Sequence, residues 1–132
     1  MKSLSAVLML LLVSFAHAPA QAQAPGDAAR GKGLYETRCG ICHAMDENKI
    51  GPKHRGVVGR KAGSVPGYEY SAGFAKQPDL VWTDKNLDAW IAAPENVVAG
   101  QKMVFYVVEA DVRADIIAWL KQQAATAPAP AK

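Results

Sequence analysis

Residues 39–43 read Cys39-Gly40-Ile41-Cys42-His43, two cysteines separated by two residues with a histidine directly after the second. This C-x-x-C-H spacing is the attachment signature of haem c. One helical turn places the two thiols where they can add to the two vinyl groups of a haem, and the next residue brings an imidazole to the iron. The motif therefore predicts one covalent haem c, held through Cys39 and Cys42, with His43 as an iron ligand.

Three other uses of a close cysteine pair fit the surrounding sequence less well. A thioredoxin-like redox pair lies at a strand-to-helix junction of a βαβ unit, but no alternating strand pattern precedes Cys39. A tetrahedral zinc site would need His54 as a fourth ligand, and the adjacent Cys42 and His43 are poorly placed to share one metal. A plain disulfide would suit an oxidising compartment, but it leaves His43 and the glycine-rich region that follows unexplained.

The N-terminal segment has the features of a secretory signal. Lys2 gives a positive start, residues 4–15 are apolar apart from two serines, and Ala20-Gln21-Ala22 has the small-x-small pattern of a cleavage site. The apolar run of about a dozen residues is shorter than the roughly 20 needed to span a bilayer, although an uncleaved anchor is the alternative. We predict cleavage near Ala20 or Ala22, export to the periplasm and no membrane span afterwards.

The charge balance does not favour a nucleic-acid partner. The 132-residue chain has 15 Lys and Arg against 12 Asp and Glu. Loss of Lys2 with the signal leaves 14 basic residues, a net charge of +2 before any haem is counted. No basic run accompanies this small excess, so we expect no binding to nucleic acid.

The remaining chain is long enough for one domain. Residues 16–26 are rich in Ala, Pro and Gln, and the C-terminal residues alternate Ala and Pro, so neither end can pack a core. We therefore divide the chain into a signal peptide over residues 1–22, a single all-α domain over residues 27–123 and a disordered tail over residues 124–132.

Three helices are predicted within this domain. The first runs from Asp27, a suitable N-cap, to about Arg38. The second follows the N-cap Thr83 and covers residues 84–92, and the third covers about 110–124. Both later helices carry apolar residues at helical spacing, so each is expected to bury one face.

Two features of the domain suggest close approach between segments or to a cofactor. Gly31 and Gly33 each weaken the first helix by ~1 kcal/mol relative to Ala, which suggests that another backbone passes close to both. Residues 45–82 hold six glycines and three prolines and show no sustained apolar periodicity. A loop region this long is unusual in a compact domain. It is expected where a large apolar cofactor supplies buried surface that the chain lacks.

The second axial position of a haem iron could be filled by a distant side chain or left open. Met45 is too close to His43 in the chain to pass round the porphyrin edge, whereas Met103 lies about sixty residues beyond it. Residue spacing therefore favours Met103, while ligation by His54, an open site and an ordinary core role for Met103 remain alternatives.

The sequence resembles the class I c-type cytochrome family, which includes mitochondrial-type and soluble bacterial members, across residues 27–123. The resemblance implies an all-α, small haem-wrapped cytochrome c fold with crossed N- and C-terminal helices and long loops. The matching segments occur in order: 39–43, 51–52, 56–61, 68–71, 82, 93–95, 100–105 and 115–121.

The resemblance also implies roles for individual residues. Met103 corresponds to the second iron ligand. Arg60, Tyr70 and Trp82 correspond to groups that hydrogen-bond the haem propionates, whose burial without partners would be costly. Pro52 corresponds to the residue whose carbonyl accepts a hydrogen bond from the ligand histidine.

The same family pattern implies how the terminal helices meet. Gly31 and Tyr35 correspond to the contact face of the first helix, which is crossed by Ile116 and Trp119 of the last.

Three departures from the family pattern concern the surroundings of the haem. Gln101 stands where a hydroxyl residue is usual in the ligand loop, and Tyr106 follows Phe105 where a small residue is usual. His54 stands where a leucine is usual, and we interpret it as a packing or surface residue.

The implied function is that of a periplasmic single-haem electron carrier, not an enzyme, cycling Fe(III)/Fe(II) with His/Met axial ligation. Its expected partners are redox proteins such as an oxidase, a reductase, a reaction centre or a dehydrogenase, bound transiently by a monomer. The alternative is a five-coordinate haem c protein with gas-binding or peroxidase activity.

Overall fold

Five helices follow one another in the computed structural model of this chain, which describes residues 25–125. They are α1 (Ala28–Arg38), α2 (Ala72–Ala75), α3 (Asp84–Ala92), α4 (Pro94–Val97) and α5 (Ala110–Ala125). Within this range the only β-structure is an isolated antiparallel bridge between Lys61 and Val81. The predicted signal peptide and residues 126–132 of the predicted tail lie outside the described residues.

The three predicted helices are present. Asp27 caps α1 by accepting hydrogen bonds from the backbone N–H groups of Ala29 and Arg30, and Thr83 caps α3 through the N–H of Asn86. The last helix extends one residue beyond its predicted end, to Ala125. None of the described helices is long and apolar enough to cross a membrane.

Two short helices were not predicted, because single turns are too short to produce a recognisable apolar period. α4 begins at Pro94, whose ring suits the first turn of a helix, and Ala93 is both the C-cap of α3 and the N-cap of α4. α2 interrupts the region expected to be irregular. Its Gly73 lies against the Ala99 carbonyl, which a Cβ atom would approach to 2.2 Å.

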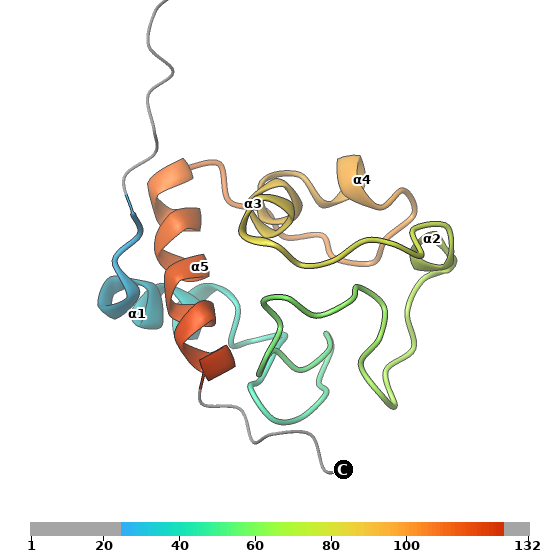
Figure 1. Ribbon diagram of the computed structural model, residues 1–132, viewed down its shortest axis with the longest axis horizontal. Coiled ribbons are helices and arrows are strands. Elements are labelled where there is room, and N and C mark those ends of the chain that lie inside the picture. Colours follow the sequence, from blue (N-terminus) through green and yellow to red (C-terminus); the bar gives the residue numbers. More distant parts are fainter. Residues whose placement is uncertain (1–24, 126–132) are drawn as a thin grey trace, which may run out of the picture.

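The terminal helices cross as the family pattern implies (Figure 1). A Cβ atom at Gly31 would lie 1.9 Å from the Asp115 carbonyl oxygen and 3.1 Å from the Trp119 Cβ, so the crossing requires glycine there. The ring centroids of Tyr35 and Trp119 are 4.4 Å apart. The expectation for Gly33 is wrong: no atom lies within 4 Å of a Cβ built there, because it is on the exposed side of α1.

The core lies between this crossing and α3, which packs against both α5 and α4. Its buried members include most of the apolar residues at helical spacing on α3 and α5, while Trp90 and Val112 are partly buried and pack against it. The buried members are Tyr35, Val57, Ala62, Trp82, Leu87, Ile91, Val107, Ile116, Ile117, Trp119 and Leu120.

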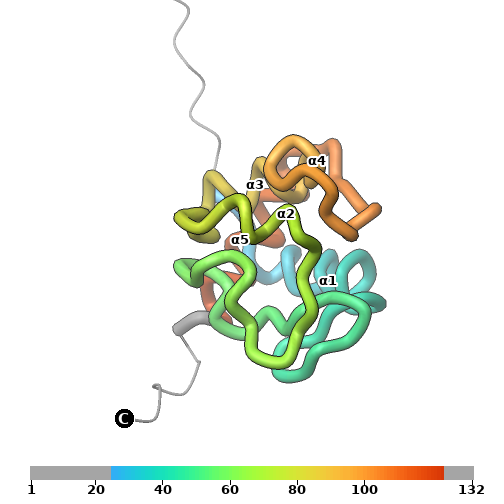
Figure 2. Tube along the Cα trace, turned by 90° about the vertical axis from the view of Figure 1, so that its right-hand side faces the viewer, coloured from blue at the N-terminus to red at the C-terminus, as the bar shows by residue number. Residues whose placement is uncertain are grey.

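The loop region after α1 forms a separate side of the molecule, with α3, α4 and residues 98–108 on the other side and α2 at the edge between them (Figure 2). Backbone hydrogen bonds connect the two sides where residues 59–62 run beside residues 80–82. Gly59 N–H donates to the Trp82 carbonyl (2.9 Å), and Trp82 N–H donates to the Arg60 carbonyl (2.9 Å). This pairing places Arg60 next to Trp82.

Candidate haem site

The cysteine motif forms a turn that continues directly from α1. Cys39 N–H donates to the Tyr35 carbonyl (2.8 Å), and the N–H groups of Cys42 and His43 both donate to the Cys39 carbonyl (3.1 and 2.9 Å). Both thiols are free and partly buried, so the structure contains no disulfide between them. Burial raises the pKa of the Cys39 thiol to about 11. The backbone therefore presents two thiols and an imidazole from one continuous turn.

The His43 imidazole is oriented by a backbone carbonyl. Its Nδ1 is 2.8 Å from the Pro52 carbonyl oxygen, the contact that the family pattern implies. A carbonyl can only accept, so Nδ1 donates and Nε2 keeps its lone pair. Burial holds the pKa of His43 below its ordinary value, although the Pro52 bond opposes this shift. Neutral His43 therefore offers Nε2 to a metal.

The two faces of the His43 ring are also in contact with neighbours. A Cβ atom on Gly51 would lie 2.1 Å from His43 Cε1 and 2.6 Å from both ring nitrogens, so the Gly51 backbone lies directly over the ring. The His54 ring stacks on His43 with centroids 3.9 Å apart and an interplanar angle of 21°. Because both neighbours lie over the ring, they occupy opposite faces. His54 thus packs on His43, which supports the first of the two roles, packing or surface, that the sequence suggested for it.

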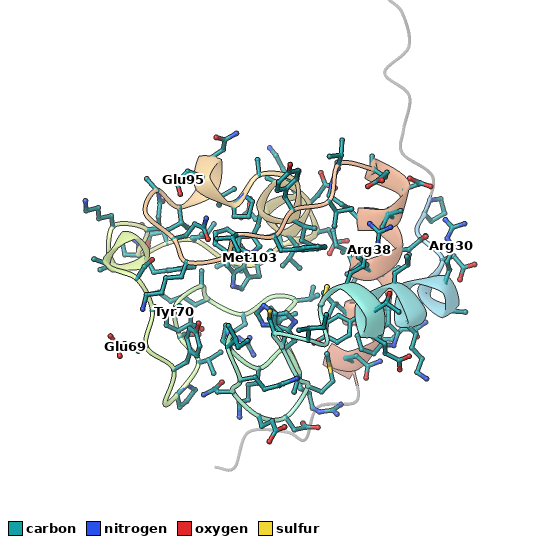
Figure 3. The ribbon with its side chains drawn as sticks, turned by 180° about the vertical axis from the view of Figure 1, so that it is seen from behind. Arg30, Arg38, Glu69, Tyr70, Glu95 and Met103 are labelled. Atoms are coloured by element: carbon teal, nitrogen blue, oxygen red, sulfur yellow. The ribbon has the colours of Figure 1, made fainter. Side chains whose placement is uncertain are left out.

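Met103 lies in a loop that is restrained by hydrogen bonds to side chains. Gly100 turns with φ +71, and its N–H donates to Glu95 Oε1 (2.9 Å). The Met103 N–H donates to the side-chain oxygen of Gln101. Met103 is partly buried and lies at the middle of the molecule in Figure 3, across from the loop that carries Tyr70.

Arg60 is a partly buried cation whose hydrogen bonds go to backbone carbonyls. Its two terminal nitrogens donate to the carbonyls of Arg55 (3.0 Å) and Lys53 (2.9 Å). Burial lowers the pKa of Arg60, while nearby Tyr70 opposes the shift. No carboxylate among the described residues forms an ion pair with it. A propionate would supply the missing negative charge.

The other two predicted propionate residues lie close to Arg60 in different ways. Tyr70 Oη accepts a 3.4 Å hydrogen bond from the Val65 N–H, and its pKa is raised by burial. Trp82 is buried and lies beside Arg60 through the backbone pairing described above.

Ser71 is a polar residue of this region that sequence reasoning did not single out. Its Oγ is buried and has no hydrogen-bond partner, the one such side-chain atom in the described part of the chain. Buried hydroxyls normally have a partner, so this atom indicates that an acceptor is missing. The sequence feature that could have identified Ser71 is its position directly after Tyr70, a predicted propionate-binding residue.

Apolar side chains around the motif and the ligand loop are exposed in the protein chain alone. Ile41, within the cysteine motif, is 71% exposed, and Phe105, two residues after Met103, is 41% exposed. Exposed large apolar groups usually mark a binding surface. Together with Arg60, which has no ion-pair partner among the described residues, and the Ser71 hydroxyl, they fit a flat apolar group that carries carboxylates. The residues present therefore suit a haem.

The fold and this site define a small all-α protein that wraps loops around a covalently bound haem. Comparisons with known proteins agree. The sequence profile of the family described as Cytochrome c matches residues 28–124. The chain belongs to the cytochrome c family.

Three relatives illustrate this membership. The chain is 44% identical over 99 residues to cytochrome c of Euglena viridis, covering 73% of this chain and 96% of that protein. It is 43% identical over 100 residues to cytochrome c2 of Rhodopila globiformis, covering 74% and 93%. The solved structure of cytochrome cH from Methylobacterium extorquens superposes with a TM-score of 0.69 at 40% identity, covering 74% of this chain and 99% of that chain.

Family membership establishes the cofactor and the class of activity. The family carries one covalent haem c attached through two cysteines, which here are Cys39 and Cys42. The protein is therefore a haem electron carrier and not an enzyme.

Proposed function

We propose that this cytochrome c is a periplasmic electron carrier whose haem iron is ligated by His43 on one face and Met103 on the other. The observation that carries the proposal is the orientation of His43. Its Nδ1 is committed to the Pro52 carbonyl at 2.8 Å, so Nε2 is the nitrogen left for iron, directly after two free thiols.

The Met103 loop supports the second ligand. Backbone hydrogen bonds to the side chains of Glu95 and Gln101 restrain the loop, and Met103 lies between the two sides of the molecule (Figure 3). Met45, the other methionine of the described residues, packs against the hydrophobic core instead. A thioether on iron raises the reduction potential, as suits a carrier.

The haem supplies a one-electron change at iron between Fe(III) and Fe(II). The protein's own groups position it. Arg60, Tyr70 and Trp82 are proposed to bind the propionates, and Ser71 adds a buried hydroxyl with no other partner. Phe105 and Ile41 would exclude water from the edge of the ring.

The surface beside the ligand loop is proposed as the transient contact for redox partners. Val104 is 95% exposed, and Tyr106 and Val108 are exposed as well. Glu109, next to Val108, approaches Arg38 to 3.9 Å, so these two charges offset one another, and the exposed Lys102 beside Met103 adds one positive charge. We therefore expect a monomer that meets its partner through an apolar, weakly charged face and with weak electrostatic steering.

Visible absorption of the purified protein tests the ligand assignment. The expected wild-type spectrum is low-spin, with a sulfur-to-iron charge-transfer band that disappears in Met103→Ala and persists in Met45→Ala. Survival of the band in Met103→Ala would show that another residue is the ligand. A high-spin spectrum with ready CO binding to the reduced wild-type protein would instead support the five-coordinate gas-binding or peroxidase alternative.

The proposed location rests on the residues at the start of the chain. A positive start followed by a short apolar run over residues 1–22 supports export, with cleavage near Ala20 or Ala22 and a folded domain over residues 27–123. Mass spectrometry of protein from a periplasmic fraction is expected to show a mature chain that lacks this segment and retains the 124–132 tail. A mass that includes Met1–Gln21 would contradict this processing.

A further inference from the structure

We propose that His54, anchored by Tyr35, is a positioning residue that holds the ring plane of His43 about its bond to iron. This inference rests on the proposed ligation by His43. It assigns a role to a residue that does not itself contact the iron, and to a hydrogen-bonded pair that the attachment motif does not contain.

The first support is that His43 is held on three sides. Pro52 holds its Nδ1 edge, the Gly51 backbone covers one face, and the His54 ring covers the other at 3.9 Å. The Pro52 carbonyl fixes the position of His43 Nδ1, but by itself it leaves the imidazole free to rotate about the hydrogen bond. Contacts on both flat faces remove that rotation, and an interplanar angle of 21° keeps the two rings close to parallel.

The second support is that His54 is itself restrained. Its Nδ1 lies 3.1 Å from the Tyr35 hydroxyl, and the two rings meet edge to face with centroids 5.7 Å apart. The Tyr35 hydroxyl donates when the proton of neutral His54 is on Nε2. A ring held at one edge by a hydrogen bond and stacked on its face has little freedom to turn.

Tyr35 in turn is fixed by the helix crossing. It is 4% exposed and packs on Trp119 of α5 with centroids 4.4 Å apart. Two polar groups beside the core cost free energy unless they bond to each other, and two apolar side chains could fill the same space. The pair therefore connects the α1–α5 crossing to the plane of the proposed iron ligand.

The ring plane matters because the π orbitals of an axial imidazole overlap different iron d orbitals as the ring turns. That orientation determines how unpaired spin spreads over the haem in the Fe(III) protein. Haem-methyl NMR shifts and electron paramagnetic resonance g values report it directly, whereas absorption reports whether both ligands are bound.

The experiment compares three variants of the intact, haem-loaded protein. His54→Leu removes the ring, His54→Phe restores a flat ring without a nitrogen, and Tyr35→Phe removes only the hydroxyl. Ile117→Val, a change of a buried core residue on α5, is the matched control for loss of packing. Fe(III) haem-methyl shifts, g values and absorption are recorded for each.

We expect His54→Leu to rearrange the haem-methyl shifts and g values well beyond the change in the Ile117→Val control, with low-spin absorption retained. Tyr35→Phe should shift them in the same direction by less, and His54→Phe should restore them toward wild type. Unchanged shifts and g values in both His54→Leu and Tyr35→Phe would overturn the proposal. If His54→Leu does not fold, Tyr35→Phe decides alone.

The result separates this inference from the proposed function. A wild-type spectrum without His/Met low-spin features would contradict the ligation itself. A normal wild-type spectrum with insensitive variants would leave the carrier function standing and show that Pro52 and Gly51 suffice to orient His43.

Discussion

Gly31 of α1 lies directly against Asp115 of α5, since a Cβ atom at Gly31 would come within 1.9 Å of the Asp115 carbonyl oxygen. This contact is between two backbones, so neither partner can move aside as a flexible side chain could. The spacing of the terminal helices is therefore set by the absence of a single methyl group.

Gly31→Ala is expected to lower the free energy of unfolding by about 3 kcal/mol or more, because the helices must separate to admit the methyl group. Gly33→Ala is the matched control in the same helix. Nothing lies within 4 Å of its Cβ position, so it should raise the free energy of unfolding by about 0.5–1 kcal/mol through helix propensity. Denaturant unfolding measures the free energy of unfolding of both variants. Equal changes in the two variants would contradict a close backbone contact at Gly31.

Asp115 should make the stability of the protein depend on acid pH. Its side chain is buried, accepts a hydrogen bond from the Asp27 N–H (2.7 Å) and forms a salt bridge with Arg30. The Arg30 hydrogen bond, followed by the Asp27 N–H, holds the pKa of Asp115 below its ordinary value of 3.8. The unfolded chain takes up this proton at a higher pH than the folded chain does. The stabilising contribution is therefore present above pH 3.8 and is lost as the pH falls through the lower folded-state pKa.

Asp115→Asn is accordingly expected to lower stability at neutral pH and to flatten its decline on acidification. The measurement is denaturant unfolding at a series of pH values. Asp79→Asn, at an exposed position in the loop before α3, controls for the loss of one negative charge. A decline as steep in Asp115→Asn as in wild type would show that other carboxyl groups control acid unfolding.

The hydrogen bonds of the ligand loop should hold Met103 in place. Gln101→Ala removes the acceptor of the Met103 N–H, a loss of about 1 kcal/mol. An external ligand that displaces the methionine should then bind Fe(III) roughly fivefold more tightly. Titration with imidazole measures this, and Gln122→Ala on α5 is the control. An unchanged affinity in Gln101→Ala would mean that the loop is stiff without this bond.

The apolar face should give electron exchange that depends little on salt. Electron self-exchange between Fe(II) and Fe(III) copies, measured by NMR line broadening, tests this without an external partner. Val108→Lys places like charges opposite each other in the encounter, so the rate should fall several-fold at low salt and recover when added salt shortens the screening length to about 8 Å or less. Ala89→Lys on α3 adds the same charge elsewhere and should change the rate little. An equal effect of both variants would contradict docking at this face.

Local chemistry and helix ends were predictable from the sequence. The motif over residues 39–43 depends on neighbours in the chain, so its chemistry can be recognised without a structure. The N-caps Asp27 and Thr83 act on groups two or three residues away, and both were identified. The single turns α2 and α4 were missed because a four-residue helix has no repeating pattern.

The sequence by itself determined the covalent haem, the candidate ligand His43 and the three main helices, because contiguous residues or helical spacing encode each of them. Met103 was a candidate because of its distance along the chain from His43 and because of the family resemblance. Only the tertiary structure decided that Gly31 and not Gly33 lies at the helix crossing. It also decided that Ser71 Oγ is buried without a hydrogen-bond partner, and that His54 stacks on His43 while bonded to Tyr35. Such contacts join residues far apart in the chain. They depend on how the helices and loops pack, which no local pattern specifies.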